Sequence, residues 1–333
     1  MADDLPRTPG FAFLETTGPG ERGLLRAAVT VVLGAAAALA AAMVVGALVT
    51  LAAAGLATAG GSLAFFDAID LLAKGGRPNR SLLSYTYELA MAGGASIAAA
   101  LAFIAVTARR AGRPARTFVT TAPRFRWRHA VLGLVIFLPV VAAEIWLTRL
   151  ASPTADAGPL TSPGGPALER FVYVAAALGF LWCAALAEEM LFRGWLLQQA
   201  RALTRSVALI VGINAITFSL AHGDPTVGGL VTRFALGVGW AWIVLRLDGV
   251  EFAAGAHLAN NLGIALLAEP VLLIAAEPQP FEPLSVALQI GTTAALVLGV
   301  EWWVRRRAAA AGAGQGPGIS GRAAVSSPRR AGT

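Results

Sequence analysis

Long apolar runs, separated by short polar segments that often contain arginine, dominate this chain. About 20 consecutive apolar residues suffice for a helix to cross the hydrocarbon core of a bilayer. The pattern predicts eight spans, near residues 27–56, 83–107, 129–147, 171–201, 207–222, 229–245, 252–267 and 284–304. Residues 63–74 are instead amphipathic and predict a short helix, lying either in the membrane interface or in a solvated loop.

Composition supports a membrane protein of the all-α class. The chain is 56% hydrophobic and only 14% charged, whereas a soluble domain carries about a quarter charged residues. The net charge of +7 comes from arginines in short loops between the spans, as the positive-inside rule produces. We therefore expect the lipid bilayer, and no nucleic acid, as a partner. Cys183 is the only cysteine, which excludes an intrachain disulfide and a cysteine-based metal site.

Arginine placement predicts the topology and the domain boundaries. The arginine-rich segment 109–128 and the arginines at 305–307 are assigned to the cytoplasm, and the segments 151–167 and 269–283, without lysine or arginine, to the outside. Only 57–82 goes against this rule. We expect a loose cytoplasmic arm at 1–22, a membrane domain at 23–304 and a basic disordered tail at 305–333, with both termini cytoplasmic. The Ala- and Arg-rich usage points to a bacterial plasma membrane.

A charged motif, Ala-Glu-Glu-Met-Leu-Phe-Arg at 187–193, directly follows an apolar run. Ionisable residues inside a membrane are costly and mark functional sites. Glu189 and Arg193 are four residues apart on one helix face and can pair. Glu188 points about 100° away from Glu189 on a helix, so its carboxylate stays available for chemistry.

Two histidines also lie inside apolar runs. His222 shares a helix face with Phe218, and His257 shares one with Asn261. Such polar groups must face one another or a water-filled cavity. At a rise of 1.5 Å per residue, Glu188 lies about 16 Å and His257 about 13 Å from the cytoplasmic end of its own helix. His222 lies about 25 Å from the cytoplasmic end of its helix, which is deeper than the other two. The fifth span must therefore begin beyond the membrane or tilt.

A carboxylate and two imidazoles in a wet intramembrane pocket suit water activation, with the glutamate as general base. The histidines could ligate a metal or hydrogen-bond a developing oxyanion, and Asn261 is an uncharged donor for such an oxyanion. The alternatives for these residues are a buried ion network that only fixes helix packing and simple interhelical hydrogen bonds.

The ordered motifs resemble those of the CPBP intramembrane proteases, which include the CAAX prenyl endopeptidases and the bacterial Abi-like proteins. The resemblance covers about residues 170–268 and rests on Glu188-Glu189-x-x-x-Arg193, Phe218-x-x-x-His222 and His257-x-x-x-Asn261. It implies a bundle of about eight transmembrane helices around an intramembrane polar cavity that opens to the cytoplasm. It implies Glu188 as the water-activating residue, supported by Glu189 and Arg193, with His222, His257 and Asn261 lining the site.

The family resemblance also raises zinc or another divalent metal as a cofactor, with His222, His257 and Glu188 as candidate ligands. The leading hypothesis is an intramembrane endopeptidase that acts on a peptide or membrane-protein substrate at the cytoplasmic side. The alternatives are a non-catalytic membrane scaffold or immunity-type protein of the same fold, and a transporter component. Retention of every catalytic-type residue disfavours the scaffold, and the lack of internal repeats disfavours the transporter.

Overall fold

The computed structural model describes residues 11–18, 21–61, 64–73, 82–151, 160, 166–268 and 282–313. Within these residues the regular structure is helical, apart from one isolated bridge between Thr120 and Gly249. The elements are η1 (Ala12–Thr16), α1 (Leu24–Ala59), α2 (Phe65–Ala73), α3 (Leu82–Ala111), η3 (Ala115–Phe118), α4 (Trp127–Ala151), α5 (Ala167–Glu188), η4 (Glu189–Leu196), α6 (Leu197–Leu203), α7 (Val207–Ala221), α8 (Val227–Leu247), α9 (Glu251–Gly263), η5 (Ile264–Ala268) and α10 (Pro283–Ala313).

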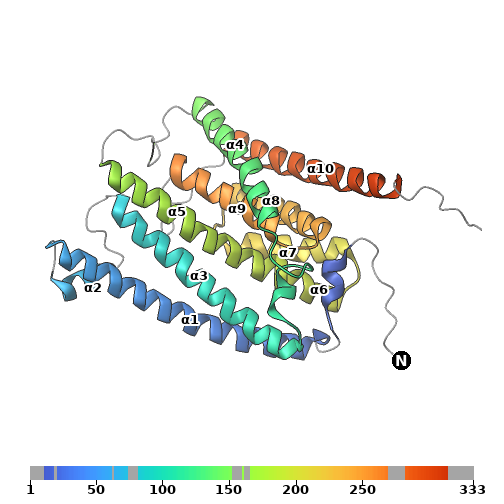
Figure 1. The fold of residues 1–333 in the computed structure, drawn as a ribbon, viewed down its shortest axis with the longest axis horizontal. Coiled ribbons are helices and arrows are strands. Elements are labelled where there is room, and N and C mark those ends of the chain that lie inside the picture. Colours follow the sequence, from blue (N-terminus) through green and yellow to red (C-terminus); the bar gives the residue numbers. More distant parts are fainter. Residues whose placement is uncertain are drawn as a thin grey trace, which may run out of the picture.

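Helix α9 forms the centre of the bundle. In Figure 1, α1, α3, α5 and α9 follow one another from the blue edge inward, and the red α10 lies at the opposite edge. Helix α4 packs along α9, while α8 packs against both α7 and α10. Close packing of α4 and α9 depends on glycine, because a Cβ at Gly255 would collide with the carbonyl of Ala130 and one at Gly133 with the carbonyl of Phe252. Small residues let membrane helices approach in this way.

The prediction of an all-α polytopic membrane protein is confirmed, whereas the count of eight spans is not. Six helices in the described part of the chain are long and apolar enough to cross a membrane, namely Leu24–Ala59, Tyr85–Ala111, Trp127–Ala151, Ala167–Leu203, Val227–Leu247 and Pro283–Ala310. Helix α7 has 15 residues, so it is about 22 Å long at 1.5 Å per residue and shorter than the roughly 30 Å hydrocarbon core. Helix α9, with 13 residues, is shorter still.

Helix ends that we assign to the cytoplasm are joined to one another by ion pairs. Arg126, which precedes α4, binds Glu251 at the start of α9 at 2.6 Å. Arg246 near the end of α8 binds Glu301 of α10 at 2.7 Å. These ends therefore lie on one face of the bundle, as the arginine pattern predicts. Their assignment to the cytoplasm stays a prediction.

The N-terminal arm is more ordered than we expected. Phe13 and Leu14 of η1 are fully buried, and the Phe13 N–H donates to Asp248 Oδ1 at 3.0 Å. Residues 11–18 are thus not loose, because these two apolar side chains are removed from water against the helix bundle. Residues 1–10 and 19–20 lie outside the described residues.

Two further expectations concern the amphipathic segment and the tail. The helix expected at 63–74 is present as α2, Phe65–Ala73. Helix α10 continues past residue 304 to Ala313, so the first part of the expected disordered tail is helical. Residues 314–333, and most of the two segments that we assign to the outside, lie outside the described residues.

Candidate active site

The helix that carries the two glutamates changes its winding at the motif. Helix α5 ends at Glu188, and the next eight residues form the π-helix η4, in which the Leu197 N–H bonds the Phe192 carbonyl five residues back. That carbonyl also accepts a hydrogen bond from Asn214 Nδ2 of α7 at 2.6 Å. Single π-helical turns are rare and frequently occur at functional sites. The hydrogen bond between Asn214 and the Phe192 carbonyl thus connects the π-helix η4 to α7.

Glu189 is a fully buried anchor for two other site residues. Its Oε1 lies 3.1 Å from Arg193 Nη1 and 3.0 Å from His257 Nδ1. The Arg193 guanidinium is also fully buried and lies 3.9 Å from the centre of the Phe218 ring, where a cation is attracted to the aromatic face. The pairing of Glu189 with Arg193 that we expect from their spacing is therefore present, and Glu189 additionally reaches His257 of α9.

Glu188 has different surroundings from those of Glu189. Its side chain is 31% exposed, and its Oε2 lies 3.6 Å from His222 Nε2 and 3.8 Å from His257 Nε2. This oxygen is buried and makes no hydrogen bond within the described structure. Both distances exceed those of a direct hydrogen bond, and a polar separation above 3.5 Å is one that a water molecule can bridge.

Hydrogen bonds at the far ring nitrogens fix the tautomers of the two histidines. His222 Nδ1 lies 2.8 Å from the Phe218 carbonyl, which can only accept, so this nitrogen carries a hydrogen. His257 Nδ1 likewise donates to Glu189 Oε1, since this oxygen already accepts from the Arg193 guanidinium. In the neutral imidazoles both Nε2 atoms therefore present lone pairs toward Glu188. Three electron-rich atoms that face one another require a proton donor or a cation among them.

The donor types in this cluster match a metal site, but the ligand set is not assembled. Metal-binding histidines usually donate their second ring N–H to a carboxylate or a backbone carbonyl, and His222 and His257 do so here. Two imidazoles and a carboxylate are also typical ligands of zinc. Within the described residues, however, no group of three or more His, Cys, Asp and Glu side chains could hold a metal ion.

A tight connection between α7 and α8 places His222. This histidine is the C-cap of α7, and Gly223, with φ of +66°, reverses the chain directly after it. Asp224 then accepts hydrogen bonds from Thr226 and binds Arg233 at 2.6 Å. Because α7 is short and ends here, the structure brings His222 beside Glu188, despite the greater depth that helix rise assigned to it.

Asn261 is the predicted site residue that the structure does not join to the others. It lies one helical turn after His257 on the same helix. Within the described residues its side chain bonds the neighbouring Asn260, at 3.3 Å, and makes no hydrogen bond to Glu188 or Glu189. Five of the six candidates are thus in one contact network.

Two residues that contact the site are not among the six candidates predicted from the sequence. Trp240 of α8 is buried, and its ring centroid lies 4.5 Å from that of His257 at an interplanar angle of 36°. In an apolar run, the sequence does not distinguish a tryptophan at the site from one that only packs in the core. Asn214, which is fully buried, left a clearer signal, because it precedes Phe218 and His222 at intervals of four residues in an apolar helix.

Comparisons with known proteins support the resemblance that the motifs carry. Residues 170–263 match the model of a family described as type II CAAX prenyl endopeptidase Rce1-like, and this segment contains all six candidate residues. The CPBP resemblance is therefore confirmed over this part of the chain. The matched family is a family of proteases.

The chain is also similar to a curated bacterial protein. It is 25% identical over 161 residues to a protein named "Uncharacterized protein YyaK" from Bacillus subtilis (strain 168). The match covers 46% of this chain and 52% of that relative, so the chain spans about half the length of the curated relative that it matches. No solved structure matches this chain.

Proposed function

We propose that this chain is an intramembrane endopeptidase in which Glu188 activates the water that attacks a peptide bond. One observation carries the proposal. The Oε2 atom of Glu188 has no hydrogen-bond partner in the described structure and lies within 4 Å of the Nε2 atoms of His222 and His257. A water molecule bound among these three acceptors would lie within reach of a general base.

Each residue of the site has a separate role in the hydrolysis of the peptide bond. Glu188 takes a proton from the water as the water oxygen bonds to the carbonyl carbon. The same carboxyl group then delivers the proton to the nitrogen as the C–N bond breaks, which releases an amine and a carboxylate. The second hydrogen of this water is accepted by the Nε2 atom of one of the two histidines, which orients the water, and the Asn261 amide, one helical turn from His257, is assigned as the donor to the developing oxyanion. Glu189 holds His257 in the required tautomer.

The candidate ligands for a divalent metal such as zinc are His222, His257 and Glu188, whose side chains would have to rearrange around the ion, since the described residues do not present an assembled ligand set. When bound, it would lower the pKa of the attacking water and polarise the carbonyl oxygen. The roles of Glu189 and of the Phe218 carbonyl are the same with or without it, because both fix the ring orientation of a histidine.

We further propose that cleavage takes place at the cytoplasmic side of a bacterial plasma membrane, on a peptide or a membrane protein. The arginine pattern of the loops supports this orientation. Exposure supports access for a substrate, since the side chains of Glu188 and His222 are 31% and 28% exposed while those of Glu189 and Arg193 are fully buried.

The test compares the peptide termini of membrane proteomes from host cells that express wild-type protein, Glu188→Gln or Glu144→Gln at equal levels. Glu144 is a matched control, because it is another glutamate within a helix. Its carboxyl group accepts a hydrogen bond from Thr292 of α10, and neither residue belongs to the network around Glu188. New termini should appear with wild type and with Glu144→Gln and be lost with Glu188→Gln. An absence of new termini with folded wild type contradicts the proposal and favours the scaffold or transporter alternatives, which crosslinking would then separate.

A further inference from the structure

A second polar feature of the molecule lies away from the candidate active site. A cavity of about 240 Å³ opens between the start of α1, the end of α3 and helix α6. None of its lining residues belongs to the site around Glu188. They are Glu21, Arg26, Ala27, Thr30, Thr107, Arg110, Ala111 and Gln199.

The cavity wall is basic once its internal ion pair is taken into account. Glu21 is engaged by Arg113 through two hydrogen bonds, of 2.8 and 3.1 Å, and its charge is thereby balanced. Arg26 and Arg110 also line the wall, and neither forms an ion pair with a described residue. Two such charges around an open space of this size create a binding place for an anion.

The two arginines are also able to donate hydrogen bonds into the cavity. Arg110 is oriented by its Nε, which donates to Thr30 Oγ1 at 2.9 Å and leaves its two terminal nitrogens available. The guanidinium of Arg26 makes no hydrogen bond to any described residue. Arginine presents a planar fork of donors that matches the oxygens of a phosphate. The cavity of about 240 Å³ has the volume of several water molecules, each of which takes up about 30 Å³ in the liquid. A phosphate group, with five heavy atoms, therefore fits inside it.

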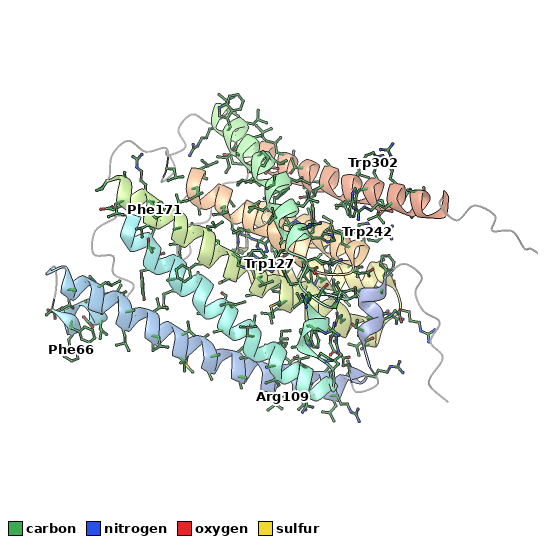
Figure 2. All side chains as sticks on the ribbon, viewed as in Figure 1. Phe66, Arg109, Trp127, Phe171, Trp242 and Trp302 are labelled. Carbon is green, nitrogen blue, oxygen red and sulfur yellow. The ribbon has the colours of Figure 1, made fainter. Side chains whose placement is uncertain are left out.

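Apolar surface adjoins the cavity on the side of α1. Leu24 and Leu25 in the first turn of α1 are 75% and 79% exposed, and Val29 and Val32 continue this exposed face. Figure 2 shows Arg109 at this end of the bundle, whereas Phe66 lies at the far end of α1 and α2. The cavity therefore lies where charged loops meet the lipid-facing helices, with room for acyl chains alongside α1.

We propose that this cavity binds the headgroup phosphate of an anionic phospholipid, whose acyl chains lie against the exposed face of α1. Basic pockets between membrane helices on the cytoplasmic side are the kind of site that recognises such headgroups. The net positive charge of the wall selects a lipid with net negative charge over a zwitterionic one. This inference is independent of the proposed peptidase activity, because it uses none of the same residues.

The test measures lipid binding to the purified full-length protein in detergent by native mass spectrometry. The protein is titrated separately with phosphatidylglycerol and with phosphatidylcholine. We expect phosphatidylglycerol to bind at least about tenfold more tightly, and this preference to fall about tenfold or more in the double variant Arg26→Gln/Arg110→Gln, since each interfacial arginine contributes about a factor of five. The matched control Arg109→Gln/Arg116→Gln removes the same charge from the same end of the bundle, outside the cavity, and should keep the preference.

Three results would overturn the proposal. They are equal binding of the two lipids by wild type, an unchanged preference in the double variant, and an equal loss in the control. Inorganic phosphate is the third probe, and its binding at micromolar concentration with displacement of the lipid would show a site for free phosphate instead. Should the double variant fail to fold, Arg26→Gln alone repeats the test, because this side chain has no bond to a described residue.

Discussion

Glu188 and Glu189 are adjacent in the sequence but are used by the fold in opposite ways. The Glu189 carboxylate is fully buried and is bound by Arg193 and His257, whereas the Glu188 side chain is 31% exposed and has an oxygen without a hydrogen-bond partner. One carboxylate is thus neutralised inside the protein, and its neighbour keeps free acceptor capacity beside two imidazoles.

This difference predicts opposite effects of the same substitution. Glu189→Gln leaves the buried guanidinium of Arg193 without its anion, so we expect a loss of about 3–5 kcal/mol in the free energy of unfolding. Glu188→Gln should leave that free energy nearly unchanged and reduce the rate of peptide cleavage by at least about 10²-fold. Thermal unfolding in detergent and a cleavage assay check the two effects.

A double variant provides the control for this prediction. Glu189→Gln/Arg193→Met removes both charges and should recover part of the lost stability, because replacing both partners of a buried ion pair costs less than removing one. Equal destabilisation by Glu188→Gln and Glu189→Gln would contradict the division of roles.

The metal-dependent form of the proposal makes a separate prediction. Zinc should bind to the purified protein with a stoichiometry near one and be lost in His222→Ala, since this side chain supplies one of three ligands. Glu144→Gln should keep the metal. Elemental analysis of the three proteins is the measurement. The absence of a stoichiometric metal that depends on His222 would leave the form in which water alone is activated.

Packing of α4 against α9 positions His257 and can be tested through glycine. Gly255→Ala would drive a methyl group into the carbonyl of Ala130, so we expect the two helices to separate, with lower stability and reduced cleavage together. Gly179→Ala is the control, because a Cβ there meets nothing within 4 Å and helix propensity favours alanine by up to about 1 kcal/mol. A melting temperature of Gly255→Ala equal to that of wild type would refute this explanation.

Asp248 links the N-terminal segment to the bundle and predicts a dependence on pH. Burial raises the pKa of the Asp248 carboxyl, although the hydrogen bond from the Phe13 N–H acts in the opposite direction. The ionised form is thus disfavoured by folding, so this carboxylate lowers the stability at neutral pH, and the loss is relieved as the pH falls through its raised pKa.

Asp248→Asn should therefore be as stable as wild type or more stable at pH 7.5, with a gain that shrinks toward pH 4. Asparagine still accepts from Phe13 and tolerates the left-handed backbone at this position, where φ is +53°. Asp248→Ala loses both advantages and should be less stable by about 1 kcal/mol. Melting temperatures at the two pH values test this, and equal losses in both variants would contradict it.

The sequence alone determined the class of the protein and the composition of the site. Long apolar runs predict membrane helices, because in lipid a helix satisfies all of its own backbone hydrogen bonds. Charged residues within such runs are energetically costly and therefore indicate a functional site. Spacings of four residues were sufficient to predict the ion pair of Glu189 with Arg193. The match of residues 170–263 to a protease family likewise depends on the sequence and not on the geometry of the site.

Tertiary structure decided what a single helix cannot encode. The bond from Glu189 to His257 and the stacking of Trp240 on that histidine join residues from different helices. The π-helix at the motif is in turn bonded to α7 through Asn214 and the Phe192 carbonyl. Helix periodicity fixes neighbours only within one helix. Which helices are short and buried, and which atoms therefore meet, depends on packing across the whole bundle, and that packing placed His222 beside Glu188 and left Asn261 outside their network.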